Sequence, residues 1–329
     1  MNFNFPSFIT TTNNGIDNID YENPQNNLIT IDKKDYIFKK LTVNGNKGGN
    51  SIILKIYSNI SIESNEDYSL LDDLKPDAIL KILKKPFKKY KGKNIYEYMH
   101  KRLLNEIQAL KKCKKKKSTN VIEIYHSGEC NIYNNNYLYY TMEVADCDLK
   151  EYIENKHKEL TFEQKIKFCR EILEGIKEID LYEFYHRDIK PDNIFIVNDK
   201  WKIGDLGLVG GRGLDYEIIE KNSFIGPRGW ISPEVMNKYL TEDKNFKIKF
   251  DCDIDRQSDI FQLGKLFWYI FQHNAPIGTV KLKDFDNEFS EVFPILKTML
   301  NHSKQKRYKT VDEIIPLFKT VEKKLLFMP

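Results

Sequence analysis

Apolar and polar positions along the chain form two successive patterns, first mainly of strands and then mainly of helices. Alternating apolar positions predict strands at residues 36–41, 52–57, 77–83, 121–125 and 137–144. Apolar positions spaced three and four residues apart predict helices at 95–112, from 148, at 162–179 and at 258–269. No internal repeat interrupts this order. Strands followed by helices predict an α+β fold.

The two ends of the chain differ from this central region. Residues 1–27 are rich in Asn, Thr and Asp and have no apolar period, so we expect residues 1–35 to be a flexible N-terminal extension. A regulatory arm is the alternative interpretation of this segment. The folded domain is expected over residues 36–320, with a C-terminal tail at 321–329.

Composition narrows the class of protein. The 329 residues carry 52 basic and 48 acidic side chains, and this balance argues against a dedicated nucleic-acid binder. The five cysteines form no Cys-x-x-Cys pair, so neither a disulfide framework nor a zinc site is expected. The most apolar segment, residues 260–271, is short and contains a lysine. We therefore expect a cytoplasmic protein without a membrane span.

One stretch in the middle of the chain combines side chains suited to phosphoryl transfer. Residues 185–193 form a polar loop around a proline, and an apolar strand follows directly. Asp188 can orient a hydroxyl, Lys190 can meet a phosphate, and Asn193 can hold Mg²⁺. A loop held by a strand is a common place for such groups.

The residues of this loop, Tyr-His-Arg-Asp-Ile-Lys-Pro-Asp-Asn, resemble the catalytic loop His-Arg-Asp-x-Lys-Pro-x-Asn of the protein kinase superfamily. The resemblance implies a two-lobed fold that binds ATP in the cleft. The N-lobe, at about 36–144, would hold an antiparallel sheet and one main helix, and the C-lobe, at about 145–320, would be mostly helical. Lys190 resembles the serine/threonine branch of the superfamily. The resemblance therefore implies ATP, Mg²⁺ and a protein substrate.

Further segments resemble the parts of a kinase that hold the nucleotide. The turn between the first two strands corresponds to the glycine-rich loop, which covers the phosphates; it keeps Gly48 at the central glycine position, followed by Gly49, and Ile53 occupies the position of its final valine. Lys81 lies within an apolar strand, where a lysine requires an anionic partner, and resembles the lysine that contacts the α- and β-phosphates. Lys55 is the competing candidate for the phosphate-binding lysine, but too few residues separate it from the glycine-rich turn.

The helix at 95–112 resembles the kinase helix whose glutamate pairs with that lysine, and Glu106 is the matching residue. An ordinary surface glutamate is the alternative. By the same resemblance, Met142 lies at the back of the adenine pocket, and the backbone of Glu143 and Ala145 hydrogen-bonds the base. Asp205, in Gly-Asp-Leu-Gly, corresponds to the aspartate that is the main Mg²⁺ ligand.

The segment after Asp205 resembles a kinase activation segment. Ser223 stands at a common phosphosite position, and Arg187 would receive its phosphate. Pro227 stands where serine/threonine kinases usually have a threonine. The resemblance also predicts an ion pair between Glu234 and Arg307, and an aspartate, Asp259, that holds the backbone of the catalytic loop.

Two rival classes stay open at the level of sequence. A pseudokinase, acting as an ATP-binding or scaffold module, is suggested by the incomplete glycine-rich loop and by Pro227. A small-molecule kinase of related fold would phosphorylate metabolites and no protein. Turnover of ATP distinguishes the first rival from a protein kinase, and the acceptor distinguishes the second.

Overall fold

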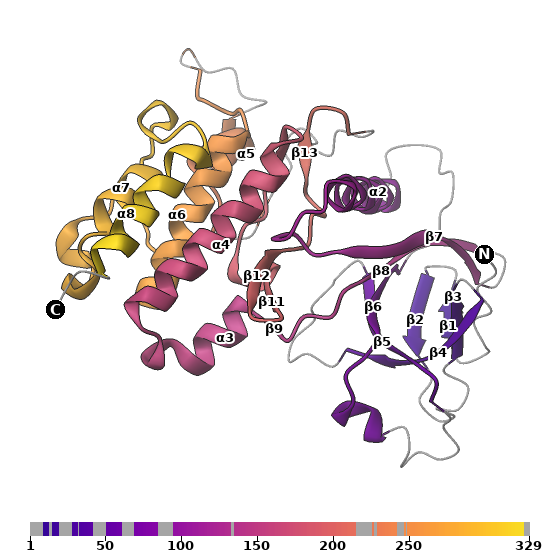
Figure 1. Cartoon of the computed structure of the whole chain (residues 1–329). Coiled ribbons are helices and arrows are strands. Elements are labelled where there is room, and N and C mark those ends of the chain that lie inside the picture. Colours follow the sequence, from indigo (N-terminus) through magenta and orange to yellow (C-terminus); the bar gives the residue numbers. More distant parts are fainter. Residues whose placement is uncertain are drawn as a thin grey trace. The chain divides into compact units, whose positions relative to one another are not determined.

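The structure is a computed structural model that describes residues 9–12, 15–19, 28–31, 33–41, 51–60, 69–84, 95–132, 135–214, 226, 229–241, 247 and 249–325. The chain divides into two compact units (Figure 1). The first comprises Met1–Ile107 and Glu123–Val144, and the second comprises Gln108–Ile122 and Ala145–Pro329.

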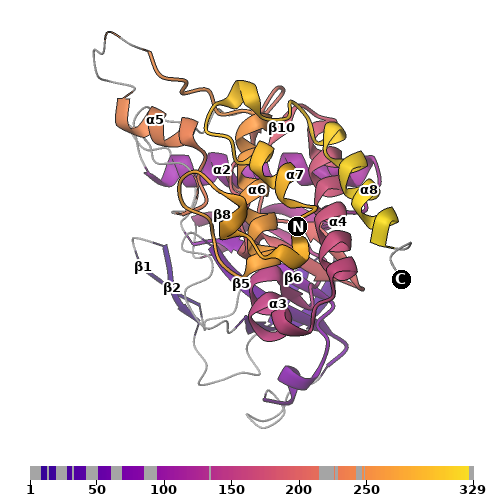
Figure 2. The same cartoon turned by 90° about the vertical axis from the view of Figure 1, so that its left-hand side faces the viewer.

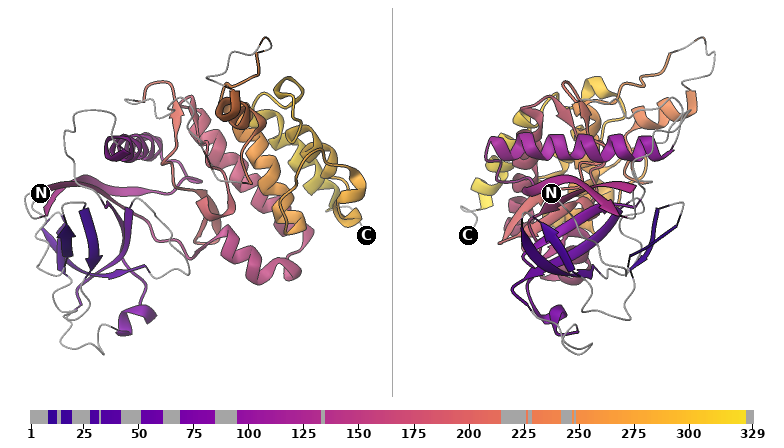
Figure 3. Two further views of the ribbon diagram at one scale, coloured as in Figure 1. Left: turned by 180° about the vertical axis from the view of Figure 1, so that it is seen from behind. Right: turned by 90° about the vertical axis from the view of Figure 1, so that its right-hand side faces the viewer.

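A curled antiparallel sheet of six strands forms the first unit, in the order β3-β4-β5-β6-β8-β7 (Figure 3). Its strands are β3 (Leu28–Ile31), β4 (Lys34–Lys40), β5 (Ser51–Ser58), β6 (Ala78–Leu83), β7 (Ile124–Ile132) and β8 (Asn135–Met142). A short 3-10 helix, η2 (Leu71–Asp73), lies between β5 and β6. The strands predicted for this part of the sequence are therefore present, and the one predicted from 121 begins at Ile124 and runs further than expected.

Side-chain alternation explains which face of the sheet is buried. Leu80 and Ile82 of β6 point into a core cluster that also contains Phe38, Leu54 and Tyr139. Lys81, between them, points to the opposite face because successive residues of a strand alternate. The lysine predicted to need an anion is thus kept out of the apolar cluster.

Part of the expected N-terminal extension belongs to this sheet. Strand β3 pairs with β4 from Leu28 opposite Ile37 to Ile31 opposite Lys34, and Ile29 and Ile31 are 1% and 2% exposed. These residues are therefore core, not a loose extension, and the sheet begins before residue 36. Upstream, β1 (Ile9–Thr12) and β2 (Gly15–Ile19) form a separate hairpin (Figure 2).

Helix α2 (Ile95–Lys115) is the one long helix whose residues contribute to both units. It extends the predicted helix by one turn. Its last turn carries Lys112, Lys114 and Lys115, where cations interact favourably with the negative end of the helix dipole. Lys117, just after the helix, has a φ of 57° and ends it in the left-handed conformation.

The second unit is mostly helical. Its helices are α3 (Leu149–Lys156), α4 (Phe162–Asp180), α5 (Pro233–Thr241), α6 (Arg256–Gln272), α7 (Phe293–Met299) and α8 (Ile315–Leu325). Among them α4, α6, α7 and α8 lie side by side (Figure 1). Short 3-10 helices lie between the elements of this unit: η3 (His157–Glu159), η4 (Pro191–Asn193), η5 (Leu282–Asp284), η6 (Asn287–Phe289), η7 (Lys304–Lys306) and η8 (Val311–Glu313). Helix α6 is buried over most of its length, as its nearly continuous apolar sequence predicts.

Two small sheets in this unit flank the polar loop at 185–193. Strand β11 (Ile194–Val197) pairs with β12 (Lys200–Ile203) and with β9 (Cys147–Asp148). Strand β10 (Phe184–Tyr185) pairs with β13 (Gly210–Gly211). The loop therefore leaves one short sheet and enters another, so both of its ends are fixed.

The last described helix passes the predicted domain boundary. Helix α8 continues to Leu325, Val321 is 5% exposed, and Glu322 is paired with Arg170. Residues 321–325 are thus part of the helical unit, not a tail. None of the described helices is both long and apolar enough to cross a membrane.

Candidate active site

The predicted catalytic residues lie together in the second unit, on the loop between β10 and β11. Lys190 Nζ lies 3.2 Å from Asp188 Oδ2. Asn193 Nδ2 donates to the backbone oxygen of Asp188 at 2.7 Å and to its Oδ2 at 2.9 Å. Because both amide hydrogens of Asn193 are directed at Asp188, its Oδ1 is the atom that remains for a cation.

Burial sets the protonation of this cluster. Asp188 is 7% exposed, and its burial raises the pKa of the carboxyl from 3.8 to about 6. The ammonium of Lys190 opposes this rise, the negative charge of Asp205 adds to it, and the hydrogen bond from Asn193 opposes it. The carboxylate is therefore ionised at neutral pH and has a higher proton affinity than an exposed aspartate.

Helix α6 fixes the backbone of this loop. The carboxylate of Asp259 accepts the N–H of His186 at 2.6 Å and the N–H of Arg187 at 2.8 Å. Gln262, one turn later, accepts the N–H of Ile189 at 3.1 Å and donates to the oxygen of Arg187 at 3.2 Å. The role predicted for Asp259 is confirmed. The sequence reasoning missed Gln262, although an amide three residues after Asp259 in an apolar helix is a visible signal.

His186 connects the loop to the strand that precedes Asp205. Its Nδ1 accepts the N–H of Asp188 at 3.2 Å, and its Nε2 lies 3.1 Å from the oxygen of Gly204. Burial lowers the pKa of His186 to about 4, so the ring is neutral and carries its proton on Nε2. Gly204 N–H also donates to the oxygen of Asn193 at 3.0 Å. These bonds place Asp205, the next residue, beside the loop.

Asp205 and Arg187 both have unusual backbone conformations. Their φ values are 50° and 66°, in the left-handed region that few residues other than glycine adopt. The guanidinium of Arg187 lies against Gly210, where a Cβ atom would come within 1.9 Å of it. Glycine is thus required at 210 for this approach. Ser223, the predicted phosphosite, and Pro227 lie outside the described residues.

The first unit carries the predicted ion pair. Lys81 Nζ lies 2.9 Å from Glu106 Oε1 and 3.0 Å from its Oε2, and the two side chains are 13% and 1% exposed. The hydroxyl of Tyr140 donates to Glu106 Oε1 at 2.8 Å. The interpretation of Glu106 as a surface residue is therefore wrong. Lys55, the competing lysine, lies on β5 opposite Ile79.

Other residues predicted to contact the nucleotide lie on the sheet or at its end. Ile53 is directly opposite Lys81 in the β5–β6 pairing, so the two side chains share a face. Met142 is the last residue of β8. The N–H of Glu143 donates to the oxygen of Glu123 at 3.0 Å, so this N–H is bound within the protein. Ala145 follows in the connection to β9, and the two glycines 48 and 49 lie outside the described residues.

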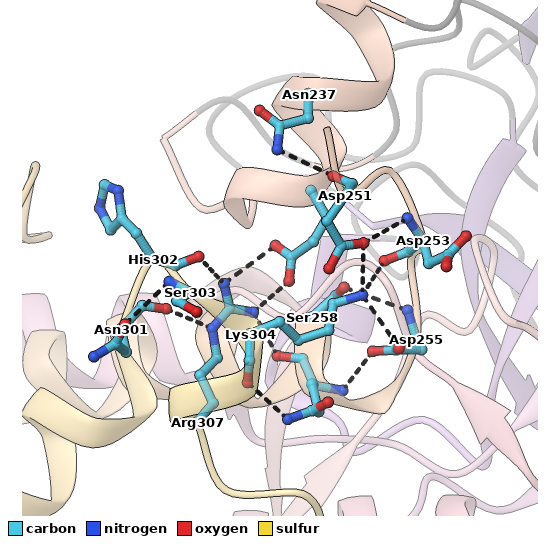
Figure 4. Close-up of polar contacts among 12 residues, drawn as sticks. Asn237, Asp251, Asp253, Asp255, Ser258, Asn301, His302, Ser303, Lys304 and Arg307 are labelled. Atoms are coloured by element: carbon cyan, nitrogen blue, oxygen red, sulfur yellow. Dashed lines mark hydrogen bonds and ion pairs between the residues drawn. The ribbon is translucent and has the colours of Figure 1, made fainter. Parts of the chain in front are cut away.

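A second polar cluster joins the start of α5 to the loop before α8 (Figure 4). Arg307 and Glu234 form the predicted ion pair, with Nη2 to Oε2 at 3.3 Å, and both side chains are at most 2% exposed. Arg307 also donates to the backbone oxygens of Asn301, Gln257 and His302. This pair supports the fold and has no chemical group to offer a substrate.

Beside this pair, a lysine lies among three aspartates (Figure 4). Lys304 Nζ is 3.2 Å from Asp251 Oδ1, 2.6 Å from the backbone oxygen of Asp253 and 3.2 Å from Asp255 Oδ2. Asn237 of α5 donates to the backbone oxygen of Asp251 at 3.0 Å. The ammonium has a partner for each of its three protons, and it holds the loop between α5 and α6.

Comparison with known proteins agrees with this geometry. The family described as "Protein kinase domain" matches residues 78–327. The chain belongs to the protein kinase family. The match begins at β6, so the predicted glycine-rich hairpin lies upstream of it.

This kinase is similar to several curated protein kinases. It is 25% identical over 265 residues to the serine/threonine-protein kinase mph1 of Schizosaccharomyces pombe, covering 78% of this chain and 34% of the relative. It is 27% identical over 140 residues to the dual specificity protein kinase TTK of Mus musculus, covering 43% and 16%. It is 36% identical over 97 residues to misshapen-like kinase 1 of Rattus norvegicus, covering 29% and 6%. The chain thus matches about a third or less of each relative's length.

The chemistry of the predicted cation ligands suits Mg²⁺. Mg²⁺ prefers oxygen ligands, retains several waters and usually binds one or two protein groups together with substrate phosphates. Asn193 Oδ1 and the carboxylate of Asp205 are such a pair. Among the described residues no group of three or more His, Cys, Asp or Glu side chains is arranged to hold a metal. A cation shared with ATP phosphates needs no such group.

Proposed function

We propose that this kinase transfers the γ-phosphate of ATP to Ser or Thr hydroxyls of a protein substrate. The observation that carries the proposal is the buried carboxylate of Asp188, held by Asn193 and paired with Lys190. In this role Asp188 orients the acceptor hydroxyl and takes its proton. The hydroxyl oxygen forms a bond to the γ-phosphorus, the bond to the bridging oxygen breaks, and ADP leaves.

The remaining roles follow from charge. Lys190 would neutralise the transferred phosphoryl group, and Asn193 and Asp205 would hold a Mg²⁺ ion that offsets the negative charge of the phosphates. Lys81, held by Glu106, contacts the α- and β-phosphates, with Ile53, Gly48 and Gly49 also near the nucleotide. Met142 and the backbone of Glu143 and Ala145 form the contacts to the base.

Specificity for Ser and Thr rests on two supports. Lys190, two residues after Asp188, resembles the serine/threonine branch, and the relative mph1 carries that name. Dual specificity, which the TTK name states for that protein, is the competing outcome. Phosphorylation of Ser223 within this chain, with Arg187 as the receiving cation, belongs to the same proposal.

Intact mass and phosphosite mapping after incubation with Mg²⁺ and ATP test this function. Purified wild type and Asp205→Ala are compared in parallel, with a peptide library that offers Ser, Thr and Tyr acceptors. Phosphate gained only by the wild-type reaction, on Ser or Thr, supports the proposal. Phosphate on Tyr overturns the specificity, and ATP binding without any transfer supports a pseudokinase instead.

The same assay distinguishes a protein kinase from a small-molecule kinase. Such an enzyme would consume ATP in the presence of a metabolite mixture and leave every peptide unmodified. Ser223→Ala supplies a separate control for the regulatory site. Unchanged activity in that variant would exclude Ser223 as a regulatory phosphosite without affecting the proposed reaction.

A further inference from the structure

Lys112, in the last turn of α2, contacts the chain shortly after Asp205. Its Nζ donates to the backbone oxygen of Gly213 at 2.9 Å. Gln108, one helical turn earlier, donates to the same oxygen at 3.4 Å. One carbonyl group therefore receives two side chains from the same face of one helix.

Two further contacts of Lys112 involve the segment before the catalytic loop. Its ammonium lies 4.8 Å from the centre of the Phe184 ring, within the range of a cation–π interaction. Its backbone oxygen accepts the hydroxyl of Tyr182 at 2.8 Å. The rings of Tyr182 and Phe184 are stacked, with centroids 5.7 Å apart. Lys112 is thus bound to the strand that enters the catalytic loop and to Gly213, the second residue after β13.

The contacts of Lys112 matter because Gly213 lies shortly after Asp205 in the chain. Gly213 lies eight residues after Asp205, and the intervening β13 pairs with β10 through Phe184 opposite Gly211. Arg212 N–H also donates to the oxygen of Glu183 at 3.3 Å. Gly211 and Gly213 have φ values of 134° and 75°, so the path of the backbone there depends on glycine. The segment is short, and the Lys112 contact fixes its far end.

The neighbouring lysines show that this contact is specific. Lys111, Lys115 and Lys116 are exposed, and within the described part of the chain none of their ammonium groups has an ion-pair or hydrogen-bond partner. Their presence is explained by the negative end of the helix dipole and by solvation. Lys112 is only partly exposed and has three distinct contacts, so a general preference for basic residues does not account for it.

We propose that Lys112 is a positioning residue that holds the segment from Asp205 to Gly213 against the C-terminal half of α2. The inference rests on the proposed function, because it assigns Asp205 to Mg²⁺. Glu106 lies six residues earlier on the same continuous helix, so the helix that carries the lysine partner also carries this anchor. Loss of the ammonium frees the segment and weakens the placement of the Asp205 carboxylate.

Amide hydrogen exchange of the nucleotide-free protein tests the anchor without requiring activity. The variant Lys112→Met keeps the aliphatic stem and removes the charge, Lys112→Arg restores a cation, and Lys111→Met is the matched control. We expect the amides of Gly211 and Arg212 to exchange about threefold to tenfold faster in Lys112→Met, as the loss of one charge-assisted hydrogen bond implies. Lys112→Arg should restore most of the protection, and Lys111→Met should exchange as the wild type does.

The kinetic arm measures the rate of phosphate transfer against Mg²⁺ concentration. Lys112→Met should raise the Mg²⁺ concentration for half-maximal rate about threefold to tenfold, with the KM for peptide unchanged. Unchanged exchange at Gly211 and Arg212, or equal acceleration in Lys111→Met, overturns the anchor. If Lys112→Met exchanges faster but its rate of phosphate transfer depends on Mg²⁺ as in the wild type, the proposed effect of Lys112 on the placement of Asp205 is overturned. A wild type that transfers no phosphate refutes the proposed function, while the exchange result still decides whether Lys112 is an anchor.

Discussion

Replacing Asp188 by asparagine should stabilise the folded protein while abolishing phosphate transfer. The pKa of Asp188 is raised from 3.8 to about 6, mainly because the carboxyl is buried. The folded state therefore holds this proton more tightly than the unfolded chain does. At pH 7.5 the group is ionised in both states, and burial of its charge costs folding free energy. An amide of nearly the same shape removes that charge.

The expected gain is the difference between two opposing contributions. The rise of the pKa from 3.8 to about 6 corresponds to about 3 kcal/mol of lost folding free energy at neutral pH, and this figure already includes the attraction to Lys190 and the hydrogen bond from Asn193. The side-chain N–H groups of asparagine would face the donors of Lys190 and Asn193, which costs about 1–2 kcal/mol. We therefore expect the free energy of unfolding to rise by about 1–2 kcal/mol.

Urea denaturation at several pH values, without nucleotide or Mg²⁺, measures this difference. Below the unfolded pKa the carboxyl is protonated in both states, so only the cost of the amide donors remains and Asp188→Asn should be about 1–2 kcal/mol less stable than wild type. Between about pH 4 and pH 6 the folded wild type binds more protons than the unfolded chain, so its stability falls relative to the variant as pH rises. Above pH 6 the difference should be constant.

Asp192→Asn, in the same loop, is the matched control, because that side chain is partly exposed. Its free energy of unfolding at pH 7.5 should equal that of the wild type. The reasoning is refuted if Asp188→Asn is no more stable than wild type at pH 7.5, or if its advantage shrinks as pH rises.

Three further substitutions test the packing and polar contacts by thermal or urea unfolding. Lys304→Met should cost about 1–2 kcal/mol, because it leaves partly exposed aspartates without their cation, while Lys306→Met should be neutral. Gly175→Ala should destabilise by about 1–2 kcal/mol, since its Cβ would lie 2.5 Å from the oxygen of Asn120 and the gain in helix propensity is smaller. Tyr140→Phe should cost about 1 kcal/mol by removing its hydrogen bond to a buried carboxylate, and an unchanged midpoint would contradict that contact.

Local sequence predicted the elements whose signals are long and periodic. The helices at 95–115 and 162–180 and the central strands follow from apolar spacing that many residues repeat. The protein kinase family was predicted from one dense motif, the catalytic loop. The ion pair of Lys81 and Glu106 could be predicted because a lysine in an apolar strand requires an anion and because the resemblance to the kinase helix pointed to Glu106.

Elements that depend on distant partners were not predictable in this way. Strand β3 has only four residues, and pairing with β4 stabilises it more than its own sequence does. Residues 321–325 read as a tail because their apolar positions are few, yet Val321 is buried and Glu322 is paired within the helical unit. In both cases some stabilising contacts reach residues far away in the sequence: Ile29 and Ile31 belong to the core cluster that contains Tyr137, and Glu322 pairs with Arg170.

The catalytic loop shows why a motif predicts chemistry better than geometry. The residues of the motif identify the reacting groups. The motif does not show what holds them in place, because Asp259 and Gln262, about seventy positions later, bind four backbone groups of the loop. Burial raises the pKa of Asp259 to about 7, and the N–H groups that it accepts oppose this rise by stabilising the charged form. The positive φ of Arg187 is held in place by the same bonds. An intact motif without this support would keep the reacting side chains and lose their arrangement, so α6 has to be judged together with the loop when activity is inferred from sequence.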